Sequence, residues 1–121
     1  MIDHTGIGVA DMPRSAAFYD AVLGALGLRH VAEMPEGVAT DGIGYGRDHP
    51  IFWIDRFHPH SVRPHTAFVA QGTAEVDAFH RAGLQAGGRD NGAPGFRRPD
   101  YYAAFLLDPD GNNIEAVFRG G

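Results

Sequence analysis

The chain has 121 residues, of which 44% are hydrophobic and 21% charged, a composition typical of one globular domain and not of a disordered segment. The formal charge is −5 and the basic residues form no block, which argues against a nucleic-acid partner. No apolar run approaches the length of a membrane span. We therefore expect a cytoplasmic protein with neither a membrane nor a nucleic-acid partner.

Two missing residue types narrow the chemistry that the chain can carry. The sequence has no cysteine, which excludes disulfides, thiolate metal ligands and thiol nucleophiles. It has no lysine either, because all 10 of its basic residues are arginine, and this excludes Schiff-base catalysis. Any bound metal ion would have to be held by His, Asp, Glu or water.

The first half of the sequence begins with a predicted strand and a predicted helix. Alternating apolar residues predict the strand over 2–10. Asp11 is a suitable N-cap, and apolar residues at helical spacing from Phe18 to Leu26 predict an amphipathic helix that ends near Gly27. Glycine-rich turns then separate short strands, predicted over 29–33, over 37–40 or 42–46, and over 51–56.

The second half repeats the first. A shift of 61 residues places His4-Thr5 on His65-Thr66 and Ala17-Phe18 on Ala78-Phe79. The predicted elements repeat as well: a strand over 65–70, a helix from a cap at Thr73 to Gly87-Gly88, and strands near 88–91, 101–107 and 114–118. The sequence thus predicts an α+β fold, a single domain over 1–121 made of two βαβββ units. The units span about 1–57 and 64–121, and a His/Pro-rich linker spans about 58–63.

The last strands of the two units align with a slightly different shift. A shift of 63 residues places 51–56 on 114–119, which two inserted residues in the loops of the second unit would explain. In this alignment Phe52 takes the position of Glu115.

The repeat favours a metal site made of His4, His65 and Glu115. The two histidines begin the first strand of each unit, so their imidazoles converge if the units pack side by side. Glu115 lies in an otherwise apolar strand, where an ionised carboxylate costs several kcal/mol unless it is paired or metal-bound. Such a set suits one divalent ion of Fe, Mn, Ni or Zn. The alternatives are ordinary hydrogen-bonded histidines, and a salt bridge from Glu115 to an arginine.

Aromatic residues on the predicted strands are candidates for the wall of a substrate pocket. They are Phe52 and Trp53 in the first unit, and Tyr101 and Tyr102 in the second. Successive strand residues face opposite sides, so we expect one of each pair to face the pocket. Arg56, Arg97 and Arg98 are candidates for holding an anionic substrate. Core packing and solvated surface arginines are the alternatives.

Three segments resemble the vicinal-oxygen-chelate superfamily, which includes glyoxalase I, bleomycin-resistance proteins, fosfomycin-resistance proteins and extradiol dioxygenases. These segments are 2–9 together with 14–19, then 64–68, and 104–115, which reads D-P-D-G-N-N-I-E at its end. The resemblance implies a half-open, cupped β-sheet around a metal ion and its small-molecule substrate. It also implies a homodimer, with the site within one chain or across two.

The resemblance implies an activity class, with one departure. Glyoxalase-like members take His and Glu from each unit, whereas Phe52 stands in the place expected for the first Glu. This departure argues against glyoxalase I activity, and the set His4, His65 and Glu115 resembles that of extradiol dioxygenases and of fosfomycin-resistance thiol transferases. The expected function is a metal-dependent lyase, isomerase or dioxygenase that acts on an oxygen-rich molecule. The alternatives are a non-catalytic small-molecule or antibiotic-binding protein of the resistance type, and a silent structural or regulatory dimer.

Overall fold

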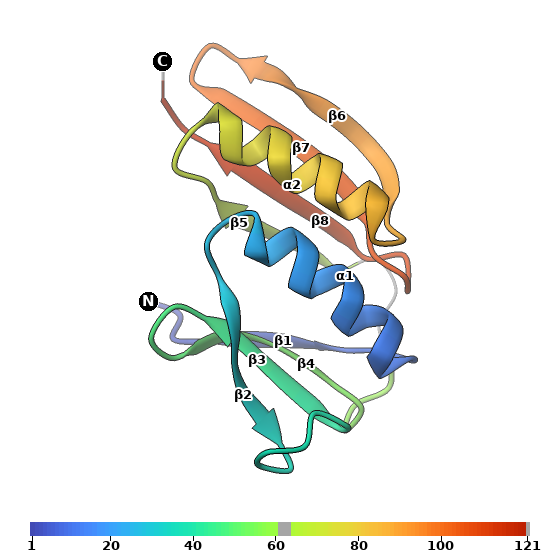
Figure 1. Cartoon of the computed structure of the whole chain (residues 1–121). Helices are drawn as coiled ribbons and strands as arrows, with labels where there is room; N and C mark the ends of the chain where they lie inside the picture. The colour runs from blue at the N-terminus through green and yellow to red at the C-terminus, as the bar shows by residue number, and fades with distance from the viewer. Residues whose placement is uncertain (61–63, 121) are drawn as a thin grey trace.

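The computed structural model describes residues 1–60 and 64–120 and contains two units of similar topology (Figure 1). Each unit has one helix and one four-stranded sheet. Within the described residues, no helix is long and apolar enough to cross a membrane. The predicted α+β fold of two βαβββ units is confirmed.

The first unit runs from the N-terminus to Asp55. Its elements are β1 (Thr5–Gly8), α1 (Met12–Gly24), β2 (Arg29–Met34), β3 (Gly42–Gly46) and β4 (Pro50–Asp55). The strand order is β1-β4-β3-β2, with β1 parallel to β4 and the other neighbours antiparallel. This order leaves β1 as an edge strand.

The second unit has the same order of elements. They are β5 (His65–Val69), α2 (Thr73–Gln85), β6 (Arg89–Arg98), β7 (Tyr101–Leu107) and β8 (Asn113–Phe118). The strand order is β5-β8-β7-β6, and β5 pairs in parallel with β8. Here β5 is the edge strand, so the first strand of each unit lies at an edge of its sheet.

Most predicted helices and strands are present. Their observed bounds differ from the predicted ones where glycine or proline favours a turn. Asp11 caps α1 as expected, because its side chain accepts a hydrogen bond from the Arg14 amide. Thr73 is the first residue of α2, and Gly72 is the N-cap in its place. The strand predicted near 88–91 extends to Arg98, because irregular pairing in β6 accommodates its glycines and Pro94. Of the predicted linker, residues 61–63 lie outside the described residues.

The core lies between the helices and one face of each sheet, and it continues from one unit to the other. Helices α1 and α2 contact each other along their length. Gly83 of α2 makes this approach possible, since an added Cβ would lie 2.2 Å from Leu106 Cδ1 and 2.9 Å from Val22 Cγ1. The Phe52 ring packs edge-on against Phe68, with centroids 5.2 Å apart. The opposite face of each sheet, the open face, is free of helices.

The D-P-D-G turn between β7 and β8 ties the two units together through Asp108. This carboxylate is 1% exposed and accepts hydrogen bonds from the Asp110 and Asn112 amides and from the Asn112 side chain. The Tyr19 hydroxyl of α1 also donates to it, at 2.6 Å. Burial, together with the nearby Asp108 charge, holds the pKa of Tyr19 well above its usual range. The turn therefore anchors the first helix as well as closing a hairpin.

The strand registers correct the predicted equivalence of Phe52 and Glu115. Thr5 pairs with Phe52 in the first unit, and the equivalent Thr66 pairs with Ile114 in the second. Phe52 therefore matches Ile114, and Trp53 matches Glu115. The predicted alignment was wrong by one residue, because apolar strand sequences match almost equally well in neighbouring registers.

Candidate metal centre

Glu115 and His65 lie side by side on the open face of the second unit. The parallel register of β5 and β8 pairs Ala67 with Glu115, which puts the carboxylate within reach of the edge strand. His65 Nε2 lies 3.1 Å from Glu115 Oε1. Two of the three predicted ligands are thus brought together by the sheet itself.

The other ring nitrogen of His65 fixes the orientation and the tautomer of the imidazole. Nδ1 lies 3.0 Å from the Asn113 carbonyl oxygen, which can only accept a hydrogen bond. In the neutral ring the proton is therefore on Nδ1, and the Nε2 lone pair points towards Glu115. Two lone pairs at this distance repel unless a proton or a metal ion lies between them, and a metal-bound histidine commonly has a carbonyl partner of this kind.

The Glu115 carboxylate is buried and held by Tyr101. Glu115 is 2% exposed, and the Tyr101 hydroxyl donates a short hydrogen bond to Oε2. This hydrogen bond raises the pKa of Tyr101 above its ordinary value, so the phenol keeps its proton. The Phe105 ring stacks on His65, with centroids 6.3 Å apart and planes inclined by 23°. The two donors are therefore restrained by three neighbours, Asn113, Tyr101 and Phe105.

Three arginines lie over the aromatic rings that neighbour this pair of donors. The guanidinium groups of Arg98 and Arg119 lie over the Tyr101 ring, 4.7 and 4.6 Å from its centroid. Arg97 lies 5.4 Å from the centroid of Phe105. The open face of the second unit is therefore cationic at its rim, which suits an anionic ligand.

The open face of the first unit carries His4 and Trp53. Both line a cavity of about 450 Å³, together with Asp55 and His58. The indole packs against Gly44, where an added Cβ would lie 3.0 Å from its Cε2 and Cζ2 atoms. His4 is exposed, and its Nδ1 lies 2.7 Å from Asp3. This face presents the imidazoles of His4 and His58, the Asp55 carboxylate and an aromatic wall.

His4 does not join His65 and Glu115 within one chain. The start of β1, beside the N-terminus, and the start of β5 lie on opposite sides of the molecule (Figure 1). Across residues 1–60 and 64–120, no three His, Cys, Asp or Glu side chains gather closely enough to hold a metal ion. The predicted ligands therefore lie in two separate places within one chain, His65 with Glu115 on the second unit and His4 on the first.

Three of the predicted pocket residues lie away from the open faces. Phe52 is 1% exposed and packs in the core against Tyr19 and Phe68. The Tyr102 hydroxyl donates to Asp77 of α2, so this ring lies on the helix side. Arg56 is also on the helix side and lies 3.6 Å from Asp41. These three side chains lie on the helix side of their sheets because strand alternation places their neighbours on the open face.

Strand alternation also identifies residues that the sequence prediction missed. Asp55 follows Trp53 by two residues on β4 and lines the same cavity. Phe105 and Arg119 lie on the Tyr101 and Glu115 face for the same reason. Every second residue of a strand faces the same side. Once Trp53 and Tyr101 are known to face outward, this period identifies the residues that lie beside them.

The sequence profile of the Glyoxalase/Bleomycin resistance protein/Dioxygenase superfamily matches residues 1–116. The chain belongs to this superfamily. A glyoxalase/bleomycin resistance protein from Albidiferax ferrireducens T118 is 37% identical, covers 98% of both chains and superposes with a TM-score of 0.82. No curated protein sequence matches the chain.

More distant solved structures share the fold alone. A glyoxalase/bleomycin resistance protein/dioxygenase family enzyme from Burkholderia phytofirmans PsJN is 18% identical, with a TM-score of 0.72 over 96% of both chains. A lactoylglutathione lyase from Agrobacterium tumefaciens is 21% identical, with a TM-score of 0.68 over 97% of this chain and 92% of its own. Activities therefore have to be argued from the residues of this chain.

Proposed function

We propose that the protein is a metal-dependent enzyme of this superfamily that acts on a small, anionic, oxygen-rich molecule. The observation that carries the proposal is the pair formed by His65 Nε2 and the buried Glu115 carboxylate, 3.1 Å apart. Their donor types suit a divalent ion of Fe, Mn, Ni or Zn. The Asn113 carbonyl and the Tyr101 hydroxyl orient them as outer partners orient metal ligands.

The third ligand in this proposal is His4 of a second copy of the chain. The half-site of His65 and Glu115 has two protein donors, whereas a stable site for these ions usually has three or more. Both β1 and β5 are edge strands, and Val69 of β5 is 73% exposed. Two copies that join β1 of one to β5 of the other would cover both edges and complete two equivalent sites.

The residues around the pair then have distinct roles. The bound ion would act as a Lewis acid towards neighbouring substrate oxygens. Arg98 and Arg119 bind the negative charge of the substrate, and the Tyr101 phenol keeps Glu115 in place by donating to it. Trp53 of the second copy forms the apolar wall. Asp55, two residues further along β4, is the carboxylate on that wall and the candidate proton acceptor.

The second candidate function is non-catalytic binding of a small molecule or an antibiotic. Trp53 favours it, because an aromatic ring stands where the repeat places a second carboxylate. A metal-loaded sample that binds its ligand without turning it over would support this function against the first.

Elemental analysis tests the proposal. Protein purified without chelator and supplemented with Fe(II), Mn(II), Ni(II) or Zn(II) is expected to retain about one ion per chain after desalting, as a closed three-ligand site would. Loading below about a tenth of that with all four ions would contradict the proposal, because two donors alone bind weakly.

A further inference from the structure

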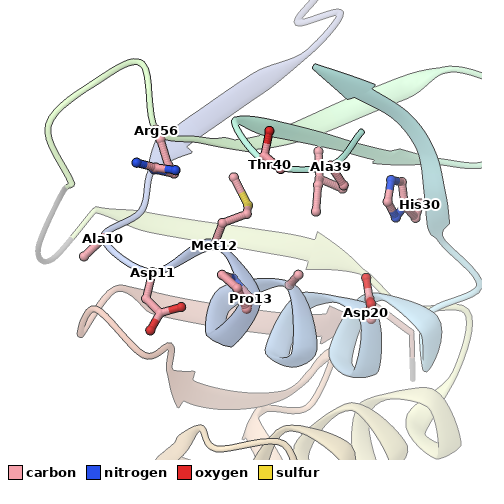
Figure 2. Close-up of a pocket in the computed structure, with 11 residues that line it drawn as sticks. Ala10, Asp11, Met12, Pro13, Asp20, His30, Ala39, Thr40 and Arg56 are labelled. Atoms are coloured by element: carbon pink, nitrogen blue, oxygen red, sulfur yellow. The ribbon is translucent and has the colours of Figure 1, made fainter. Parts of the chain in front are cut away.

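A cavity lies on the helix side of the first sheet, away from the candidate metal centre. It measures about 700 Å³ and is bounded by α1, by β2 and by the segment that leads into β3. Figure 2 shows Met12 and Ala39 in its middle, Asp20 and His30 at one end, and Arg56 at the other. Sites for small organic ligands commonly have about this volume.

The second unit provides an internal comparison, because the equivalent space there is filled. Tyr45 and Leu106 occupy equivalent register positions, so Tyr102 is the counterpart of Asp41. The Tyr102 ring reaches α2, where its hydroxyl donates to Asp77 and its ring packs on Phe96 with centroids 5.0 Å apart. In the first unit Asp41 turns towards Arg56, 3.6 Å away, and Ala16 stands in the place of Asp77. The cavity is therefore a specific feature of the first unit.

The charges around the cavity favour a cation. Arg56 is accompanied by Asp41, and His30 Nε2 lies 3.3 Å from Glu33, so neither end has uncompensated positive charge. Asp20 is exposed at the mouth. The Tyr45 hydroxyl donates to its Oδ1 at 2.8 Å, and Oδ2 accepts no hydrogen bond from a side chain in the described residues. One carboxylate oxygen thus remains for a ligand, next to an apolar floor.

We infer that this cavity is a second ligand site, which binds a small amphipathic amine with its ammonium group on Asp20 and its apolar part against Met12, Ala16 and Ile43. The site differs in charge from the open face of the second unit, where Arg97, Arg98 and Arg119 favour an anion. An amine therefore distinguishes the two sites. The inference is independent of metal binding and of turnover.

The three methionines make the test direct. Met12 is 4% exposed and lines the cavity, whereas Met1 is fully exposed and Met34 is 47% exposed outside it. The chain is labelled with ¹³C-methyl methionine and titrated with 2-phenylethylamine while methyl spectra are recorded. We expect a saturable shift of the Met12 signal with Kd on the order of 1 mM, as for a fragment of this size. The Met1 and Met34 signals should stay in place.

Matched ligands and variants test the role of charge and of space. The neutral 2-phenylethanol should bind about fivefold more weakly, and Asp20→Asn should remove that difference while it keeps an acceptor for Tyr45. Ala16→Leu should abolish the Met12 shift by filling the cavity, whereas Ala17→Leu, on the exposed side of α1, should not.

Three results would overturn the inference. One is a Met12 signal that does not move with the amine. Another is equal affinity for amine and alcohol in the unmodified chain. The third is a Met12 signal that shifts with protein concentration alone, because it would mean that a second copy covers the cavity. If Ala16→Leu fails to fold, the comparison of Asp20→Asn with the unmodified chain decides alone.

Discussion

Replacing Glu115 by Gln is expected to weaken divalent-metal binding at least about 100-fold. The substitution keeps the shape of the side chain and an acceptor for the Tyr101 hydroxyl, but it removes the carboxylate beside His65 Nε2. Isothermal titration with Zn²⁺ measures the change. The melting temperature of the metal-free variant should stay within a few degrees of that of the unmodified chain, because the side chain still fills the same space.

The control for this prediction is Glu36→Gln. Glu36 is exposed in the segment between β2 and β3, so its substitution changes the net charge equally without touching the open faces. Its Zn²⁺ affinity should match that of the unmodified chain. Equal affinities for Glu115→Gln and Glu36→Gln would place the metal ion elsewhere, and the proposed function would lose its basis.

Replacing Asp108 by Ala is expected to lower the free energy of unfolding by roughly 3 kcal/mol. The Asp108 carboxylate is 1% exposed, so its loss leaves the buried Tyr19 hydroxyl and Asn112 amide, and the half-buried Asp110 amide, without their acceptor. Urea denaturation followed by circular dichroism measures the loss. It should appear as a lower midpoint with an unchanged slope.

Two further variants separate the contributions within this turn. Tyr19→Phe removes only the hydrogen bond between α1 and the turn and should cost about 1 kcal/mol. Asp110→Ala removes a carboxylate from the same turn that accepts only a 3.4 Å contact from Ala10, so its effect should stay within about 0.5 kcal/mol. An Asp108→Ala variant as stable as Asp110→Ala would show that the turn does not anchor the first unit.

The fold was predictable because the two halves of the sequence repeat the same order of elements. The shift of 61 residues that superposes His4 on His65 also superposes the two helices, and each helix begins within a residue of its predicted cap. Periodicity located the strands but not their ends. In β6, pairing with β7 keeps glycines and Pro94 in a strand that local turn preferences would have ended early.

The sequence predicted which residue types form the candidate site, but not which strand positions face it. Glu115 stood out because a carboxylate in an apolar strand needs a partner, and the structure supplies His65 and Tyr101. Phe52 and Trp53 could not be told apart, since a shift of one residue exchanges the faces of a strand and only the pairing partner fixes it. The repeat also does not indicate whether equivalent residues such as His4 and His65 meet within one chain or between two chains.

In the proposed function, each metal site combines His4 of one chain with His65 and Glu115 of another. The most direct measurement is the metal content of a heterodimer formed by a His4→Ala chain and a Glu115→Gln chain, co-expressed with different affinity tags and purified through both. One of its two sites would have both substitutions and the other neither. We therefore expect about half of the metal content of the unmodified protein. The two parent proteins, each with a single substitution in both chains, should hold little metal. A heterodimer as poor in metal as its parents, or chains that never associate, would contradict the shared site.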